Sequence, residues 1–293
     1  MSTRRAFLVK ATAGAVGLTA VMAGAYSLVA AAGRAAVSGA ARPLSAIGIQ
    51  LYTVRDAMAA DFEGTLERLA RMGYDEVEFA GYFGRSPARV RIILDGLGLD
   101  APAAHVPLEA LRDDLEITLD TAAAVGHSWV VCPWIGPEER SSDGYLHLAD
   151  VLNRAGEAAR EVGLRVAYHN HEFELEPLGG VDTLPFELLL QRTDPALVDF
   201  ELDLFWVARA GHDPVDWFRH HPGRFPLVHV KDMDGSPERR MVDPGRGVID
   251  FPAIVARREQ AGIRHWFVEH DQPEDPFGTA RAGLEYLRGL AVP

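Results

Sequence analysis

The segment LRVAYHNHEFE, residues 164–174, is an apolar run that ends in two imidazoles and two carboxylates. It follows Gly163, and its first half is predicted to be a strand. Side chains two positions apart share one face of a strand, so His169 and His171 are expected to point the same way. Two imidazoles at one strand end suit a divalent metal or proton transfer. The alternative is a hydrogen-bonded polar cluster that only ends the strand.

Outward from this segment, short apolar runs alternate with amphipathic stretches. The apolar runs predict eight strands, at residues 47–52, 76–79, 101–105, 129–132, 165–171, 198–203, 227–231 and 266–269. The amphipathic stretches predict helices near residues 62–71, 87–97, 109–125, 144–162, 184–191, 214–220, 251–261 and 278–290. Glycine ends a helix in the left-handed conformation. Five glycines stand between a helical pattern and a strand-like run: Gly73, Gly98, Gly126, Gly163 and Gly262.

Eight strand–helix units in sequence predict a closed parallel (β/α)8 TIM barrel of the α/β class. The chain has 293 residues, and about 250 remain without an N-terminal segment, which is the usual size of such a barrel. A doubly wound open sheet is the alternative, but residues 50–56 (QLYTVRD) lack a phosphate-binding glycine pattern. No linker interrupts the chain, so residues 41–293 are expected to form one barrel domain.

Residues 1–40 are interpreted as an export signal. The start STRRAFL, residues 2–8, resembles a twin-arginine signal, and a weakly apolar stretch rich in Ala and Gly follows at residues 11–32. Small residues allow cleavage after Ala32 or Ala40, of which we favour the latter. We therefore expect a periplasmic or extracellular protein that meets the membrane only through this segment. An uncleaved anchor or an unrelated basic start is the alternative.

The overall charge argues against nucleic acid as a partner. The formal net charge is −13, from 42 acidic and 29 basic side chains, and a polyanion would be repelled. Cys132 is the only cysteine, which rules out an internal disulfide and a thiolate metal cluster. Lysine occurs only at Lys10 and Lys231.

The predicted strands end in groups that bind metals or transfer protons, and a TIM barrel forms its active site at these C-terminal ends. On the sixth strand Asp199, Glu201 and Asp203 share one face, and three inward carboxylates require a polar centre or a cation. Imidazoles and carboxylates from separate strands form a mixed set for one divalent ion, such as Mn, Co, Mg or Zn. The polar strand ends are Arg55, Glu78, His105, His169, His171, Glu201, Asp203, His229, Lys231 and Glu269.

The order of these strand ends resembles the sugar phosphate isomerase/epimerase superfamily, the xylose-isomerase-like barrels that also include inosose dehydratases and ketose 3-epimerases. The resemblance covers residues 47–290. Its most specific motifs are YHNHEFE (168–174), ELDLFWV (201–207), LVHVKDM (227–233), GRGVIDF (245–251) and FVEHDQP (267–273).

The resemblance implies metal ligands at the ends of strands five to eight. Asp203, His229 and Glu269 match the aspartate, histidine and glutamate of the epimerases on strands six to eight. His169 stands where those enzymes have a glutamate on strand five, as in a subgroup with a His-Asn-His strand. His169 is therefore the expected fourth ligand, and Glu172 or Glu174 could reach in from the loop instead.

The resemblance also implies an enzyme that isomerises, epimerises or dehydrates a sugar or keto-sugar by removing a proton next to a carbonyl. His171, Lys231 and Glu269 would handle protons and developing charge. The histidine on strand five disfavours a symmetric epimerisation between two carboxylates and leaves isomerisation, hydration and β-elimination open. Lys231 has two alternative roles, as a Schiff-base amine or in a salt bridge to Asp232 or Asp234.

Four further residues are predicted to contact substrate, each with packing or a structural connection as its alternative: His105, Trp134, Trp206 and Arg246. The expected partner is a small carbohydrate, preferably unphosphorylated, and a homo-oligomer is left open. A rival hypothesis is a non-catalytic carbohydrate-binding barrel that partners an exported oxidoreductase. DNA-repair endonucleases share the fold but have a histidine three residues after the strand-six aspartate, where this chain has Trp206.

Overall fold

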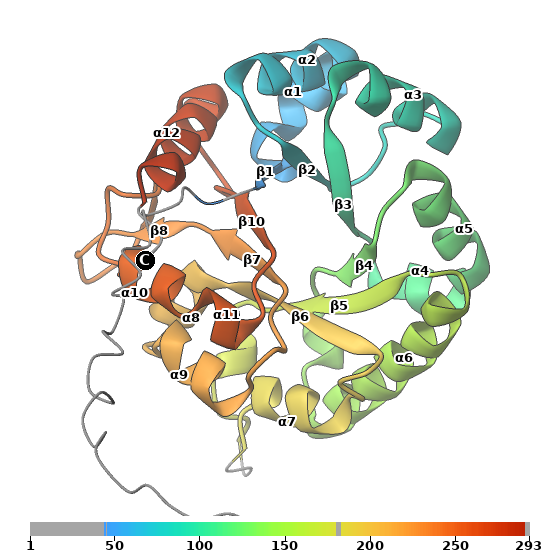
Figure 1. Cartoon of the computed structure of the whole chain (residues 1–293). Helices are drawn as coiled ribbons and strands as arrows, with labels where there is room; N and C mark the ends of the chain where they lie inside the picture. Colours follow the sequence, from blue (N-terminus) through green and yellow to red (C-terminus); the bar gives the residue numbers. More distant parts are fainter. Residues whose placement is uncertain (1–43, 45, 180–182, 291–293) are drawn as a thin grey trace, which may run out of the picture. The chain divides into compact units, whose positions relative to one another are not determined.

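A computed structural model describes residues 44, 46–179 and 183–290. The expected twin-arginine segment lies outside these residues. Eight parallel strands close into a barrel in the order β1-β10-β7-β6-β5-β4-β3-β2 (Figure 1), which confirms the TIM barrel and excludes the open sheet. The strands are β1 (Ile47–Gln50), β2 (Glu76–Phe79), β3 (Asp100–His105), β4 (Trp129–Cys132), β5 (Arg165–His169), β6 (Val198–Asp203), β7 (Leu227–Val230) and β10 (His265–Val268).

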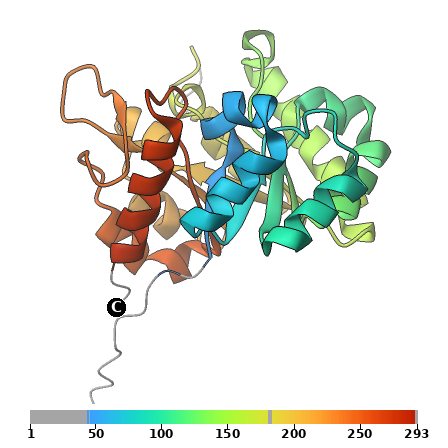
Figure 2. The same ribbon diagram turned by 90° about the horizontal axis from the view of Figure 1, so that it is seen from above.

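Helices surround the strands on the outside of the barrel (Figure 2). The helices are α1 (Arg55–Ala60), α2 (Phe62–Met72), α3 (Pro87–Leu97), α4 (Leu108–Asp113), α5 (Leu115–Val125), α6 (Ser142–Glu161), α7 (Pro185–Arg192), α8 (Leu204–Arg209), α9 (Pro214–His220), α10 (Phe251–Ala256), α11 (Arg258–Ala261) and α12 (Pro276–Gly289). The described helices include none with the length and apolar character needed to cross a membrane. The five glycines expected to end helices all have positive φ, between 66° and 107°.

Several element boundaries differ from the prediction. The first strand stops at Gln50, because its side chain accepts a hydrogen bond from Tyr52 N and opens the 3-10 helix η1 (Leu51–Val54). The fifth strand stops at His169. At the next residue, the side-chain oxygen of Asn170, rather than its backbone carbonyl, accepts the hydrogen bond from Asp203 N at 2.9 Å. The expected helices at residues 109–125 and 251–261 are each divided in two. A short antiparallel ribbon, β8 (Asp232–Met233) with β9 (Met241–Val242), follows β7.

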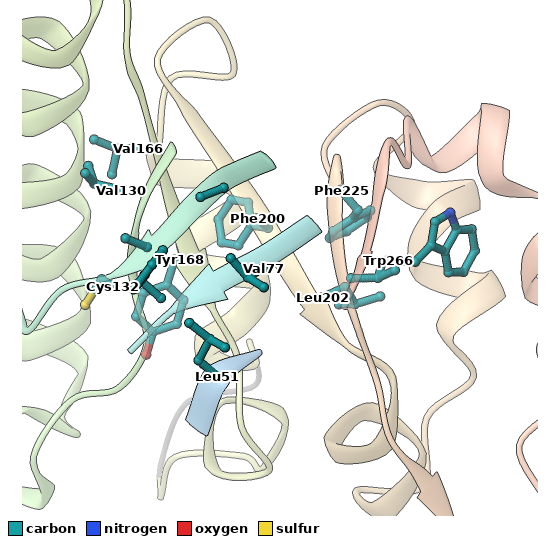
Figure 3. Close-up of a cluster of buried hydrophobic side chains, with 14 of the residues drawn as sticks. Leu51, Val77, Val130, Cys132, Val166, Tyr168, Phe200, Leu202, Phe225 and Trp266 are labelled. Carbon is teal, nitrogen blue, oxygen red and sulfur yellow. The ribbon is translucent and has the colours of Figure 1, made fainter. Parts of the chain in front are cut away.

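The apolar core lies between the strands and the helices. Outward residues of the strands, such as Tyr168 and Phe200, are fully buried against the helical layer, and Figure 3 shows part of this cluster. The first and last strand–helix units of the barrel contact each other in this core. The hydroxyl of Tyr74, which precedes β2, donates to Ala280 O of α12 at 2.7 Å. This layer fixes the outward faces, so the alternate side chains of every strand point into the barrel.

The barrel interior has three levels. At the N-terminal end, Asp199 accepts hydrogen bonds from Arg165 Nη2 at 2.9 Å and Trp129 Nε1 at 2.8 Å. The middle level is apolar and includes Leu227 and Phe267. A Cβ atom on Gly48 would lie 2.4 Å from the Phe267 ring, so only glycine leaves room for it. The C-terminal level is polar and holds the candidate site.

Candidate active site

The C-terminal level of the barrel is a buried polar cluster. Period-two alternation along each strand turns these side chains inward, and the apolar level below them shuts out water from that side. Glu78, Glu201 and Asp203 have no exposed surface, which makes their charges costly unless they are compensated. The cluster consists of the partly buried His105 and of the buried residues Gln50, Glu78, His169, Glu201, Asp203, His229, Lys231 and Glu269.

The imidazole of His229 lies between carboxylates on both of its edges. Its Nδ1 atom is 2.6 Å from Glu269 Oε2. Its Nε2 atom is 2.7 Å from Glu78 Oε2 and 3.1 Å from Glu201 Oε2. Burial alone would lower the pKa of His229, but the charges of Glu201, Glu269 and Glu78 raise it well above its usual range. The acids on both edges therefore favour the protonated, cationic form of this ring.

Lys231 is fully buried and touches three carboxylates. Its Nζ atom is 3.0 Å from Asp203 Oδ2, 2.6 Å from Glu269 Oε2 and 2.7 Å from Asp271 Oδ1. Burial would lower the pKa of Lys231, but these three acids raise it well above its usual range. A charged ammonium is not nucleophilic, so the geometry does not favour the Schiff-base alternative.

Lys231 does not form the alternative salt bridge to Asp232 or Asp234 that the sequence allowed. The Asp232 carboxylate instead accepts hydrogen bonds from Gly245 N and Gly247 N, both at 2.9 Å. These contacts fix the GRGVIDF turn as a strand–helix connection. Arg246 in that turn is exposed and lies 3.6 Å from Asp243. It borders a separate cavity beside α12, so the structure does not bring Arg246 to the cluster.

His169 faces the cluster, whereas the two loop glutamates do not. His169 Nε2 is 3.7 Å from Asp203 Oδ2, and burial lowers the pKa of His169 to about 3, which leaves the ring neutral and able to bind a metal. Glu172 accepts from Arg209 Nε at 2.9 Å. Glu174 is buried and accepts from His171 N at 2.8 Å and from the Tyr168 hydroxyl.

The donor set fits one divalent metal. Two groups of side chains each place their ligand atoms within 4.8 Å of one another: Asp203, His229 and Glu269 form one group, and His105, His169, Glu201 and His229 form the other. The predicted ligands are thus divided between the groups, with His229 in both. Within the described residues, Glu201 Oε1 is buried without a hydrogen-bond partner. Asp203 Oδ2 has only ion-pair contacts, with Lys231 Nζ at 3.0 Å and His169 Nε2 at 3.7 Å. Buried carboxylate oxygens of this kind suit a cation.

A cavity of about 520 Å³ opens above the cluster. Lys231 and Glu269 line it beside His105, whose Nε2 atom is 2.8 Å from Glu201 Oε2. His171 and Trp134 also border this cavity, whereas Trp206 borders a neighbouring one. Burial lowers the pKa of His171 well below its usual range, and its Nδ1 atom has no hydrogen-bond partner among the described residues.

Sequence reasoning did not assign a role to several residues of the cluster. Gln50 donates to Glu78 Oε2 at 2.8 Å. Glu78 was expected among the polar strand ends, whereas Gln50 was not, although alternation along the first strand could have identified it as inward. Glu201 was recognised as inward, but its contacts with three imidazoles were not expected. Asp271 follows the last strand, where alternation carries no information, and no sequence signal points to its contact with Lys231.

Comparison with known proteins agrees with this fold. The profile of the family described as xylose isomerase-like TIM barrel matches residues 66–290, which is most of the chain. The chain belongs to this family. The xylose isomerase-like barrel is 25% identical over 273 residues to an inosose dehydratase of Geobacillus kaustophilus (strain HTA426), covering 77% of this chain and 86% of the relative. An inosose dehydratase of Lacticaseibacillus casei is 28% identical over 167 residues, about half of each chain.

Solved structures share the same barrel. A sugar phosphate isomerase/epimerase from Parabacteroides distasonis ATCC 8503 superimposes with a TM-score of 0.73 at 26% identity, covering 87% of this chain and 97% of the other. The IOLI protein, crystallised with a bound zinc atom, superimposes with a TM-score of 0.64 at 16% identity, covering 82% of this chain and 95% of the other. The likeness to the second structure concerns the fold alone.

Proposed function

We propose that this protein is a divalent-metal-dependent enzyme that removes a proton next to the carbonyl of a keto-sugar or keto-cyclitol, leading to isomerisation or dehydration. The proposal rests on the contacts of the Lys231 ammonium with Asp203 and Glu269, at 3.0 Å and 2.6 Å. Lys231 and Glu269 also line the cavity. A fixed ammonium next to acidic metal-ligand candidates suits chemistry in which negative charge develops on an oxygen. The names of the relatives support the substrate class.

The proposed metal ligands are Asp203, His229 through Nδ1, and Glu269, with His169 as the fourth. A divalent metal held there would polarise the carbonyl of the substrate. Glu78 and Glu201 would keep the Nε2 proton of His229, so that Nδ1 is free to face the ligand group.

The protein's own groups can move the proton. His171 borders the cavity, and burial lowers its pKa well below its usual range, so its neutral ring is the proposed acceptor of the proton from carbon. The electrons of the C–H bond move to the carbonyl oxygen, and the Lys231 ammonium would stabilise the enolate that forms. An isomerisation is completed when the neighbouring hydroxyl passes its proton to the former carbonyl oxygen and the proton from carbon returns to the former carbonyl carbon. A dehydration is completed when a β-hydroxyl leaves with the abstracted proton as water.

Exchange of substrate protons with solvent tests this function. The metal-loaded protein is incubated in D2O with fructose, xylulose and an inosose, and proton NMR follows the signals next to each carbonyl. We expect loss of such a signal for at least one compound, no exchange after chelation, and recovery when manganese, cobalt, magnesium or zinc is added. Sugar binding that survives chelation, without exchange for any compound under any metal, would instead indicate the non-catalytic binding barrel.

A further inference from the structure

The cavity above the polar cluster continues into a second compartment. The first cavity measures about 520 Å³ and the second about 380 Å³. Trp134 and His171 line both, so the two spaces adjoin at these side chains. The second compartment is completed by Arg140, Glu172, Phe173, Glu176 and Trp206, and it contains none of the carboxylates or imidazoles of the cluster below.

Aromatic surface is exposed along the first cavity and, at Trp134, on its border with the second compartment. The exposed fraction of Trp134 is 47% and that of Tyr52 is 43%, and both side chains line the first cavity. The other large hydrophobic residues exposed in the described part of the chain are aliphatic and lie outside both compartments. An exposed aromatic face over a polar pocket is suited to stacking against a ring.

The walls of the second compartment are held in place by contacts among themselves. The Arg140 guanidinium lies 3.4 Å from the centre of the Phe173 ring and 5.1 Å from that of Trp134. Arg140 Nη2 also donates to Ile135 O at 3.0 Å. The Phe173 ring stacks on His171 at 5.6 Å with an interplanar angle of 11°, and His171 is 5.4 Å from Trp206. The compartment is therefore preformed, which lowers the entropy cost of binding a ring there.

We propose that the second compartment is a subsite for a second ring, so that the substrate is a glycoside in which a keto-sugar ring over the polar cluster is joined to another flat-faced ring. This inference rests on the proposed function, because the first ring is the sugar that undergoes proton abstraction. A free monosaccharide over Lys231 and Glu269 would leave the aromatic surface of the second compartment in contact with water. The apolar face of a sugar and that of an aryl group share the chemistry that this surface recognises.

Calorimetric titration of the metal-loaded protein tests the subsite without requiring turnover. The probes are methyl β-D-glucopyranoside, phenyl β-D-glucopyranoside and cellobiose, with the corresponding methyl, phenyl and disaccharide probes of the galactose and xylose series. We expect a two-ring probe to bind at least about fivefold more tightly than the methyl glycoside of the same sugar, the scale of one aromatic stacking contact. Trp134→Ala and Phe173→Ala should reduce this ratio to about one, and the exposed-residue control Ile117→Ala should keep it.

The outcomes separate the two proposals. An advantage for the phenyl glycoside, the disaccharide or both supports the subsite and shows which ring it prefers. Equal binding of one-ring and two-ring probes, or a ratio unchanged in both Trp134→Ala and Phe173→Ala, overturns the subsite and leaves the proposed function standing. Binding of none of the probes, together with no proton exchange on keto-sugars, overturns both. Phe173→Leu, which keeps apolar volume, provides a second variant if Phe173→Ala does not fold.

Discussion

Glu201 Oε2 lies 3.1 Å from His229 Nε2, on the edge of the ring opposite the Nδ1 atom that approaches Glu269. Glu201 has no exposed surface and occupies the strand position two residues before the proposed ligand Asp203. Buried carboxylates that hold the distant N–H of a ligand histidine fix its tautomer and orientation. We therefore propose that Glu201 positions the His229 ring.

Replacing Glu201 should weaken metal binding without removing a proposed ligand of the site. We expect Glu201→Gln to lower metal affinity about 10-fold, because His229 Nε2 loses one of its two charged neighbours and keeps only Glu78, at 2.7 Å. Competition titration against a coloured chelator measures this affinity. Asp199→Asn is the matched control, since Asp199 shares the strand face but binds Arg165 at the other end of the barrel. Equal affinity in Glu201→Gln and wild type would rule out the positioning role.

Removing two proposed ligands should abolish metal binding. Asp203, His229 and Glu269 form one group of ligand candidates, and the double variant Asp203→Ala/His229→Ala loses two of these three side chains. We expect about one equivalent of divalent metal in the wild type and less than a tenth of that in the variant, measured by elemental mass spectrometry. Full retention of metal in the variant would contradict this ligand assignment.

Lys231→Met should destabilise the metal-free protein. Three carboxylates face the Lys231 ammonium, and removing one partner of a buried ion pair costs about 3–5 kcal/mol. Urea unfolding after chelation measures the loss, and added metal should stabilise the variant more than the wild type. Arg89→Met removes an exposed ion pair with Glu63 and should cost less than about 1 kcal/mol. A similar, small change in both variants would argue against the buried charge balance.

Acid should weaken the fold through His127, which lies outside the site. Its Nδ1 atom is 2.6 Å from Ala101 O and its Nε2 atom is 2.8 Å from the Tyr82 hydroxyl, an arrangement that suits a neutral ring. Burial lowers the pKa of His127 to about 4 in the folded protein. The unfolded chain, with a histidine pKa of about 6.5, therefore binds more protons across this window, so stability falls as pH drops from about 6.5 to 4.

His127 should lower the free energy of unfolding by about 3 kcal/mol between pH 7 and pH 4. Urea unfolding at pH 7 and pH 4.5 measures it as a difference between wild type and His127→Gln, which cannot take up the proton. We expect the free energy of unfolding to fall less with acid in His127→Gln than in wild type. An identical pH dependence in both proteins would show that this ring does not control acid stability.

Export is proposed to depend on the arginine pair near the N-terminus. We expect Arg4→Lys/Arg5→Lys to retain the protein inside the cell, because a receptor reads this pair as an address. Immunoblotting of periplasmic and cytoplasmic fractions measures the distribution. Arg34→Lys, which changes an arginine outside the pair, should leave it unchanged. Periplasmic protein at wild-type levels in the double variant would contradict the twin-arginine interpretation.

The sequence by itself determined the barrel and the residues at its strand ends. Strand alternation, glycine at helix ends and eight repeated units are local properties, and the closed parallel barrel is the architecture that satisfies them together. The inward faces that hold His169, Asp203 and His229 could be predicted for the same reason.

Only the tertiary structure decided how deep each inward side chain lies and which partner it meets. Asp199, Glu201 and Asp203 share one face, but a strand rises about 3.3 Å per residue, so they reach three different levels. Asp199 binds Arg165, Glu201 holds His229, and Asp203 meets Lys231. Alternation gives the face of a side chain, whereas its depth and partners depend on the register of neighbouring strands, which no single segment contains.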